Sequence, residues 1–175
     1  MRNFEFAIIA DGIDTNDEAL VDRFYEAGCS DALITVIKGN VVLDFTREAE
    51  SLGQAVASAL RDVHRAGARA RRIEPDSYVT ISDIAERSGL TRQAVSLYAS
   101  GERGAGDFPR PVLRTTTESP LWDWLSVARW LHKNKRLDDE SLVFAELTRD
   151  INLHFECVDV EPVRQRAIEE LLATV

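Results

Sequence analysis

The stretch ISDIAERSGLTRQAVSLYASG, from Ile81 to Gly101, decides how the second part of this chain is expected to fold. Thr80, just before it, suits a helix cap, and Asp83 three residues later completes a common helix start. Gly89 suits the left-handed residue that ends a helix, and Thr91 suits the cap of a following helix. The stretch therefore predicts two short helices joined by a tight turn.

The spacing of small and apolar residues predicts which side of this helix pair is buried. Ala85 lets two helices cross closely, and Val95 places an apolar side chain between them. Ser88 is a departure, because an apolar residue is common at that position. Side chains on the other side of the second helix suit base edges: arginine can pair two donors with guanine, and glutamine can bond adenine. The predicted base contacts are Thr91, Arg92, Gln93 and Ser96, and the flanking residues predicted to touch phosphates are Arg87 and Arg103.

The segment GERGAGDFPRPVLRTTTESPLWDWLSVARWL, residues 101–131, follows the helix pair. Together they resemble the winged helix-turn-helix of MerR-like and phage-excisionase-like bacterial regulators, over residues 76–135. The resemblance implies a hairpin, the wing, over 110–115 and 119–122, with a packing helix after it. The wing residues that the resemblance places at the DNA backbone are Arg110 and Arg114. The three tryptophans have helical spacing and are predicted core residues: Trp122, Trp124 and Trp130.

Residues 1–75 are predicted to form a domain of their own. FEFAIIA (Phe4–Ala10) alternates like a strand, and a helix follows to about Ala27. Two strands joined by KGN, a long helix and a last strand complete the segment, over 31–37, 41–46, 48–66 and 69–74. The order β-α-β-β-α-β is the ferredoxin-like pattern, so the expected fold class is α+β.

Apolar residues lie on both faces of this predicted sheet, since Phe4, Phe6 and Ile8 alternate with Ala7 and Ile9. An antiparallel sheet usually turns a polar face to water. We therefore expect a second copy of the chain, or the rest of the chain, to cover the outer face. The simplest prediction is a homodimer through the N-terminal domain.

The sequence gives little reason to expect an enzyme. Asp44, Arg47 and Glu48 are interpreted as a solvated ion pair at a strand end. The three histidines occur singly, and the chain has neither a phosphate-binding glycine loop nor a nucleophile elbow. We predict no catalytic residue, metal or cofactor. A small-molecule sensor is the weakest alternative, because no residue identifies a ligand.

The net charge of −9 is unevenly distributed. Residues 76–137 carry 9 Lys+Arg and 7 Asp+Glu, whereas residues 138–175 carry 3 and 10. The field near a contact depends on local charge, so an acidic chain can still bind DNA. Two distant cysteines, no apolar run of about 18 residues and no signal peptide predict a cytoplasmic protein without a membrane segment.

The acidic segment 138–175 is predicted to form two helices, the second beginning near Pro162. Packing within the chain or across a dimer is its expected role. The whole sequence thus predicts a transcriptional regulator that binds double-stranded DNA through a winged helix-turn-helix. The alternative is an antitoxin-like or other protein-interaction module, whose acidic segment binds a partner protein.

Overall fold

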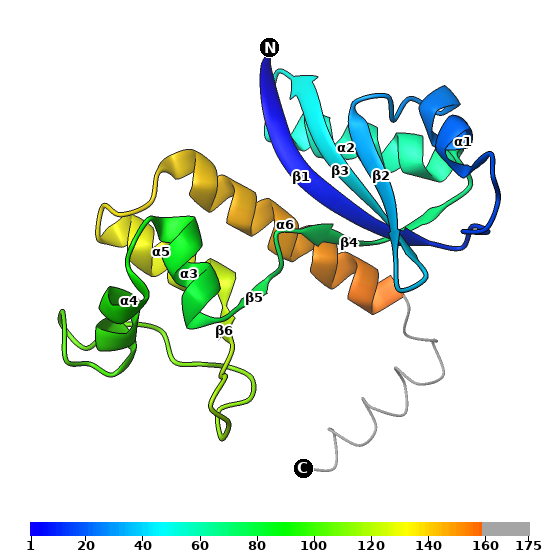
Figure 1. Ribbon diagram of the computed structural model, residues 1–175. Coiled ribbons are helices and arrows are strands. Elements are labelled where there is room, and N and C mark those ends of the chain that lie inside the picture. Colours follow the sequence, from blue (N-terminus) through cyan, green and yellow to red (C-terminus); the bar gives the residue numbers. More distant parts are fainter. Residues whose placement is uncertain (159–175) are drawn as a thin grey trace, which may run out of the picture. The chain divides into compact units, whose positions relative to one another are not determined.

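The computed structural model describes residues 1–158 and has an α+β fold, with a four-stranded antiparallel sheet and six helices in that part of the chain (Figure 1). The chain divides into two units. The first contains Met1–Ile73 and the helical residues from Asp150 onward, and the second contains Glu74–Arg149.

The first unit consists of a sheet with two helices on one face (Figure 1). Its elements, in chain order, are β1 (Arg2–Asp11), α1 (Leu20–Glu26), β2 (Ala32–Ile37), β3 (Asn40–Ala49), α2 (Leu52–Arg65) and β4 (Arg69–Glu74). The strands lie in the order β2-β3-β1-β4. The succession of strands and helices is the one that the sequence predicted.

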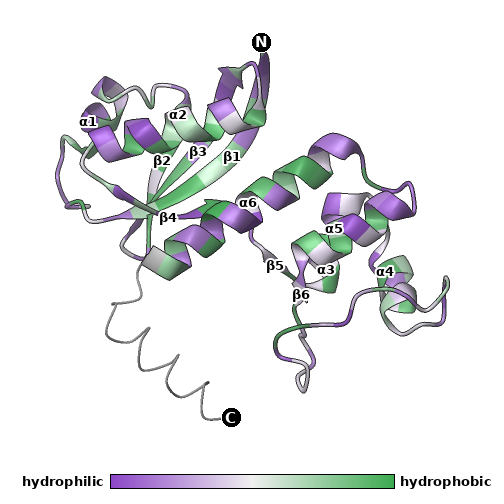
Figure 2. Cartoon of the chain, turned by 180° about the vertical axis from the view of Figure 1, so that it is seen from behind, coloured by the Kyte–Doolittle hydropathy of each residue, from purple (hydrophilic) through white to green (hydrophobic). Residues whose placement is uncertain are grey.

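Alternation along the strands explains which face the helices cover. Phe6 pairs with Phe45 across β1 and β3, their rings stacked 5.4 Å apart, and Ile8 pairs with Leu43. These four side chains are buried. Ser51 begins α2 by accepting a hydrogen bond from the Gln54 N–H, and the buried face of α2 carries Ala55, Val56, Ala59 and Val63. Figure 2 shows α1 and α2 from their own side of the sheet.

The prediction of a solvated ion pair at Arg47 is wrong. Arg47 is only 6% exposed, and its guanidinium donates two hydrogen bonds to Asp31 at 2.8 Å each and one to Asp62 at 2.7 Å. Ser58 and the Gly28 carbonyl accept two more. All these partners lie 11 to 19 residues away, so no local pattern indicates them.

Two acidic partners hold the charge of Arg47 inside the fold, and they also affect a neighbouring thiol. Burial, reinforced by the charge of Asp62, raises the pKa of Cys29 to about 11. Both cysteines are free thiols, with Cys29 buried and Cys157 exposed. A buried thiol with so high a pKa is a poor nucleophile.

The outer face of the sheet is less apolar than the sequence predicted. Ile9 and Val42 lie opposite each other on this face. Along β3, however, Val42 is followed on the same face by Asp44, Thr46 and Glu48, because side chains alternate along a strand. Polar residues therefore interrupt the apolar ones along β3, and the outer face is only partly apolar.

The second unit packs three helices and a two-stranded sheet around one core. Its elements are β5 (Tyr78–Val79), α3 (Ile81–Ser88), α4 (Arg92–Ala99), β6 (Trp122–Asp123), α5 (Trp124–Lys133) and the first part of α6 (Asp139–Val158). Trp122, Trp124 and Trp130 are all buried in this core, as predicted. Two of the indole nitrogens donate hydrogen bonds, Trp122 to the Pro109 carbonyl and Trp130 to the Asp107 carboxylate.

The acidic segment begins with α6, which contributes to both units. Ala145 belongs to the core of the second unit. Asn152 is buried in the first unit, where its side chain bonds both backbone groups of Ile73. These contacts agree with the expected packing role. The second predicted helix, near Pro162, lies outside the described residues. Within residues 1–158, no helix has both the length and the apolar composition to cross a membrane.

Candidate nucleic-acid interface

Two capped helices of eight residues each form the centre of the candidate interface. The Thr80 hydroxyl accepts a hydrogen bond from the Asp83 N–H, while the Asp83 carboxylate accepts from the Thr80 N–H at 2.7 Å. These bonds hold the pKa of the Asp83 carboxyl below its usual range, the backbone bond being the largest cause. α3 therefore starts at the residues that the sequence predicted.

The turn between α3 and α4 has the backbone conformation that its sequence predicted. Gly89 has φ 66°, in the left-handed region, where a side chain would strain the backbone. No atom lies within 4 Å of where its Cβ would be, so the need for glycine is conformational rather than steric. The Thr91 hydroxyl then accepts from the Ala94 N–H at 3.1 Å and starts α4.

The unusual Ser88 is also explained by the structure. Its hydroxyl donates to the Ile84 carbonyl at 2.6 Å, one turn back in its own helix. A hydroxyl satisfied in this way can lie near the turn without an outside partner.

Burial divides α4 into two faces. Ala94, Val95 and Tyr98 are buried against the core of the second unit. The Tyr98 ring packs edge to face against Trp130 at 5.0 Å and stacks on Phe108 at 6.3 Å, and the Phe108 and Trp130 rings meet edge to face at 4.9 Å. The four predicted base contacts are all exposed: Thr91, Arg92, Gln93 and Ser96. The helix thus presents two long hydrogen-bonding side chains, Arg92 and Gln93, on a rigid support.

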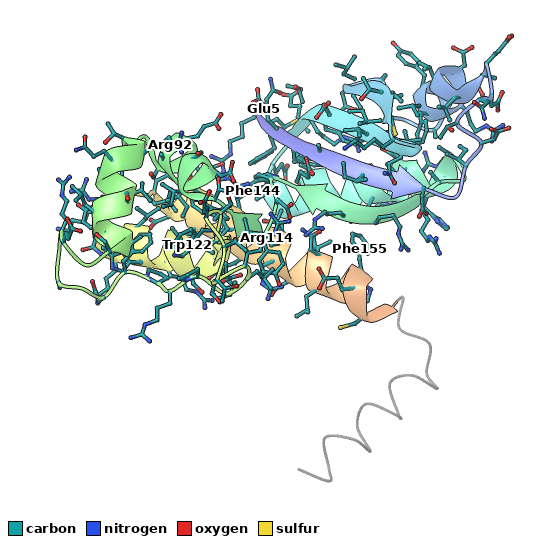
Figure 3. All side chains as sticks on the ribbon, turned by 60° about the horizontal axis from the view of Figure 1, so that its bottom comes forward. Glu5, Arg92, Arg114, Trp122, Phe144 and Phe155 are labelled. Atoms are coloured by element: carbon teal, nitrogen blue, oxygen red, sulfur yellow. The ribbon has the colours of Figure 1, made fainter. Side chains whose placement is uncertain are left out.

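A groove of about 400 Å³ lies beside this exposed face. Its walls come from the start of α3, the exposed side of α4 and the loop at 118–120. Arg92, Gln93 and Ser96 line it. Thr91, capping the helix, does not. Figure 3 shows the side chains of the second unit, with Arg92, Arg114 and Trp122 labelled.

The groove also contains residues that the sequence prediction missed. Ser82 lines it from the first turn of α3, and Glu118 lines it from the loop. Ser82 lies in the first turn of a helix whose start the sequence predicted, so its place at the start of α3 follows from local sequence. Glu118 approaches α4 only because of how the loop folds, which no local pattern specifies. Its carboxylate opposes an anionic ligand.

The hairpin that the resemblance implied after α4 is shorter than predicted. Its only described pairing is a single bridge, in which Leu121 donates to the Leu113 carbonyl at 2.9 Å and Leu113 donates to the Leu121 carbonyl at 3.2 Å, an acceptor that also takes the Val112 N–H at 2.8 Å. Trp122, expected to continue the hairpin, instead pairs with Val79 in β5. Proline explains the short ladder, since Pro109, Pro111 and Pro120 have no N–H to donate.

The arginines outside α4 fall into two groups. Arg110 and Arg114 are exposed on the loop, and Arg114 has φ 51°. Arg103 is exposed and lies over the Tyr98 ring at 5.0 Å. Arg87 is different: it donates to the Asp76 carbonyl at 2.8 Å and lies over the Trp124 ring at 5.0 Å. Burial lowers the pKa of Arg87.

A second basic region lies at the end of α5. Lys133, Lys135 and Arg136 line an open hollow of about 790 Å³. Acidic groups oppose them, because Lys133 pairs with Asp107 at 3.3 Å and Asp138 shares the hollow. The net charge there is therefore smaller than the count of lysines and arginines suggests.

Comparison of the chain with protein-family models, with curated proteins and with solved structures finds no match.

Proposed function

We propose that the protein is a sequence-specific DNA-binding transcriptional regulator, and that α3, α4 and the loop after them act as a winged helix-turn-helix. The observation that carries the proposal is the pair of capped eight-residue helices joined at a left-handed Gly89, with Arg92 and Gln93 exposed on the second helix. A short helix with a free polar face fits the major groove, where base edges are distinguishable.

In this proposal α4 is the recognition helix. Arg92 pairs with a guanine edge and Gln93 with an adenine edge, while Ser96 and Thr91 add single hydrogen bonds. Arg110, Arg114 and Arg103 contact phosphates, which position the protein without reading sequence. Arg87 is left out, because its guanidinium is engaged with Asp76 and Trp124.

We also propose a ferredoxin-like topology for the first unit. The strand order β2-β3-β1-β4, with two helices on one face, supports it. This unit brings two DNA-binding units together in a homodimer, so that paired half-sites can be bound. As a regulator of transcription, the protein is expected to act in the cytoplasm and to need no catalytic residue.

Selection from random duplex DNA tests the proposal directly. Full-length protein is incubated with a random library, and the bound fragments are sequenced over several rounds. The wild type should enrich one motif, and the Arg92→Ala/Gln93→Ala double variant should lose that enrichment. Arg129→Ala is the matched control, because Arg129 is an exposed arginine of the same unit, paired with Glu146 on α6. The proposal fails if folded wild type enriches nothing.

The alternative of a protein-interaction module has one observation in its favour. The acidic helix α6 exposes the apolar side chain of Val143 in the second unit. A partner protein that covered it would bind without DNA. The same selection separates the two functions, because a protein-interaction module that does not bind DNA should enrich no motif.

A further inference from the structure

The two edges of the four-stranded sheet are protected very differently. β4 forms one edge, and the Asn152 side chain accepts from the Ile73 N–H at 2.7 Å and donates to the Ile73 carbonyl at 2.9 Å. The amide thus occupies the backbone groups that another strand would use. Three arginines in β4 add charge to this edge: Arg69, Arg71 and Arg72. Charge and covering groups are common means of preventing edge-to-edge pairing.

β2 forms the other edge and has none of these protections. Its sequence, ALITVI, contains no charged residue and no proline. Three of its six side chains are exposed, Leu33 at 67%, Val36 at 45% and Ile37 at 53%. Within residues 1–158, no strand pairs with β2 on the side away from β3. A flat, uncharged and apolar edge is a template for another strand.

The pairing with β3 determines which backbone groups of β2 face outward. Thr46 donates to the Asp31 carbonyl at 3.0 Å, so these two residues form a hydrogen-bonded pair. Such pairs alternate along an antiparallel ladder. The backbone N–H and C=O groups of Leu33, Thr35 and Ile37 therefore point toward β3. The N–H and C=O groups of Ile34 and Val36 therefore point to the free edge.

We propose that β2 pairs antiparallel with β2 of a second copy of this chain, about a two-fold axis that passes between the two Thr35 residues. Ile34 of each copy then exchanges two backbone hydrogen bonds with Val36 of the other. Leu33 lies directly opposite Ile37 of the other copy, on the outer face of the sheet. The pairing joins two four-stranded sheets into one and covers the exposed apolar side chains of β2.

The chemistry of β2 favours a second copy over an unrelated strand. Antiparallel pairing of identical strands makes the two exposed residues on the outer face, Leu33 and Ile37, each other's cross-strand neighbours. The strand is thus complementary to itself.

This inference rests on the proposed homodimer and specifies its surface. It differs from pairing through the outer face of the sheet, where polar residues on β3 interrupt the apolar ones. Edge pairing depends on the backbone of β2, whereas face packing depends on side chains such as Ile9 and Val42. Substitutions can separate the two.

Val36→Pro in the full-length chain tests the backbone contact. It removes an N–H that points away from β3, so the ladder within the sheet keeps its hydrogen bonds. Sedimentation equilibrium at micromolar concentration should show a wild-type dimer, and a dissociation constant about 10- to 100-fold higher for the variant, which loses one hydrogen bond per copy. Val36→Thr retains the N–H and should remain a dimer. Circular dichroism must show that both variants are folded.

Charge substitutions test the side-chain register. Leu33→Lys and Ile37→Glu should each weaken the dimer, while the double variant should regain it, because each lysine then faces a glutamate of the other copy. The control is Val21→Lys on α1, since Val21 is 51% exposed and Ile37 is 53% exposed. Only a specific register predicts rescue.

The outcomes are distinguishable. A monomeric wild type overturns the proposed homodimer and this inference together, while the DNA selection still tests the helix-turn-helix. A dimer that Val36→Pro leaves intact but Val42→Lys dissociates overturns edge pairing alone and favours the outer face. Failure of the double variant to regain the dimer overturns the Thr35-centred register.

Discussion

Some arginines of the first unit and some of the second are used in opposite ways. In the first unit, Arg47 is buried and its guanidinium donates to two carboxylates, a hydroxyl and a carbonyl. Arg69 and Arg71 there both pair with Asp11. In the second unit, Arg92, Arg110 and Arg114 are exposed. Residue counts treat these arginines alike, yet the first set stabilises a fold and the second set is available to a ligand.

This contrast explains how a chain of net charge −9 is compatible with DNA binding. Carboxylates neutralise arginines only where the fold brings them together, as Asp31 and Asp62 do at Arg47. The exposed face of α4 itself contains Arg92 and no carboxylate, although Glu118 from the following loop lines the same groove. The local field beside that helix, rather than the total charge, acts on a phosphate within a Debye length of about 8 Å.

Arg47→Met is expected to lower the free energy of unfolding by about 3 kcal/mol, the lower end of the range for breaking a buried ion pair. Asp62 would keep its charge in a partly buried site without a counter-ion, while Asp31, 30% exposed, would be partly rehydrated. Urea denaturation measures the loss. Arg47→Lys should lose less, because it keeps the charge but not the two-point contact. If folded Arg47→Met instead weakened DNA binding at unchanged stability, the contrast between the units would be wrong.

Arg92→Ala and Gln93→Ala are expected to weaken binding to the selected site by about 1–3 kcal/mol each. Each should also flatten the preference at one or two base pairs, because a base edge loses its partner. Fluorescence anisotropy on specific and scrambled duplexes measures both effects. Neither exposed side chain packs in the core, so the unfolding free energy should not change. Equal losses on both duplexes would exclude base reading.

The predicted parts of this interface share a feature that the missed parts lack. Thr80, Gly89 and Thr91 act on groups within three residues of themselves, so their roles can be deduced from local sequence. The same holds for the alternation of β1. Arg47 and Asn152 bind residues 11 to 79 positions away, and only the folded chain brings them together.

The wing shows a third situation, in which a resemblance implied more structure than its residues support. Its prolines are plain in the sequence, and each removes a donor from the expected ladder. These prolines predict a short bridge in place of a full hairpin ladder. The approach of Glu118 to α4 could not have been predicted in this way, because it depends on a turn at Arg114 in the left-handed region.

Asp83→Asn is expected to destabilise the second unit by about 1 kcal/mol near neutral pH, as loss of a capping carboxylate does. Because the folded state lowers the pKa of Asp83, its contribution is present above the unfolded pKa of about 4 and is lost as pH falls through the folded value. The difference between wild type and variant should therefore shrink below about pH 4. Thermal unfolding at several pH values measures it, with exposed Glu86→Gln as the control. A difference independent of pH would contradict the role of the charge.

Arg114→Gly should have the smallest effect on DNA affinity. How that effect depends on duplex sequence and on salt is more informative than its size. Glycine removes the charge while accepting φ 51° without strain, so the loop keeps its turn. A lost phosphate contact should weaken specific and scrambled duplexes alike, by about 0.5–1 kcal/mol at physiological salt. It should also reduce the slope of log K against log salt by about 0.9, whereas Arg114→Lys should retain the slope. Titrations at three salt concentrations give both quantities. A loss confined to one base pair, with an unchanged slope, would assign Arg114 to base reading, as proposed for Arg92. The exposed arginines of the second unit would then no longer divide into those that contact bases and those that contact DNA phosphates.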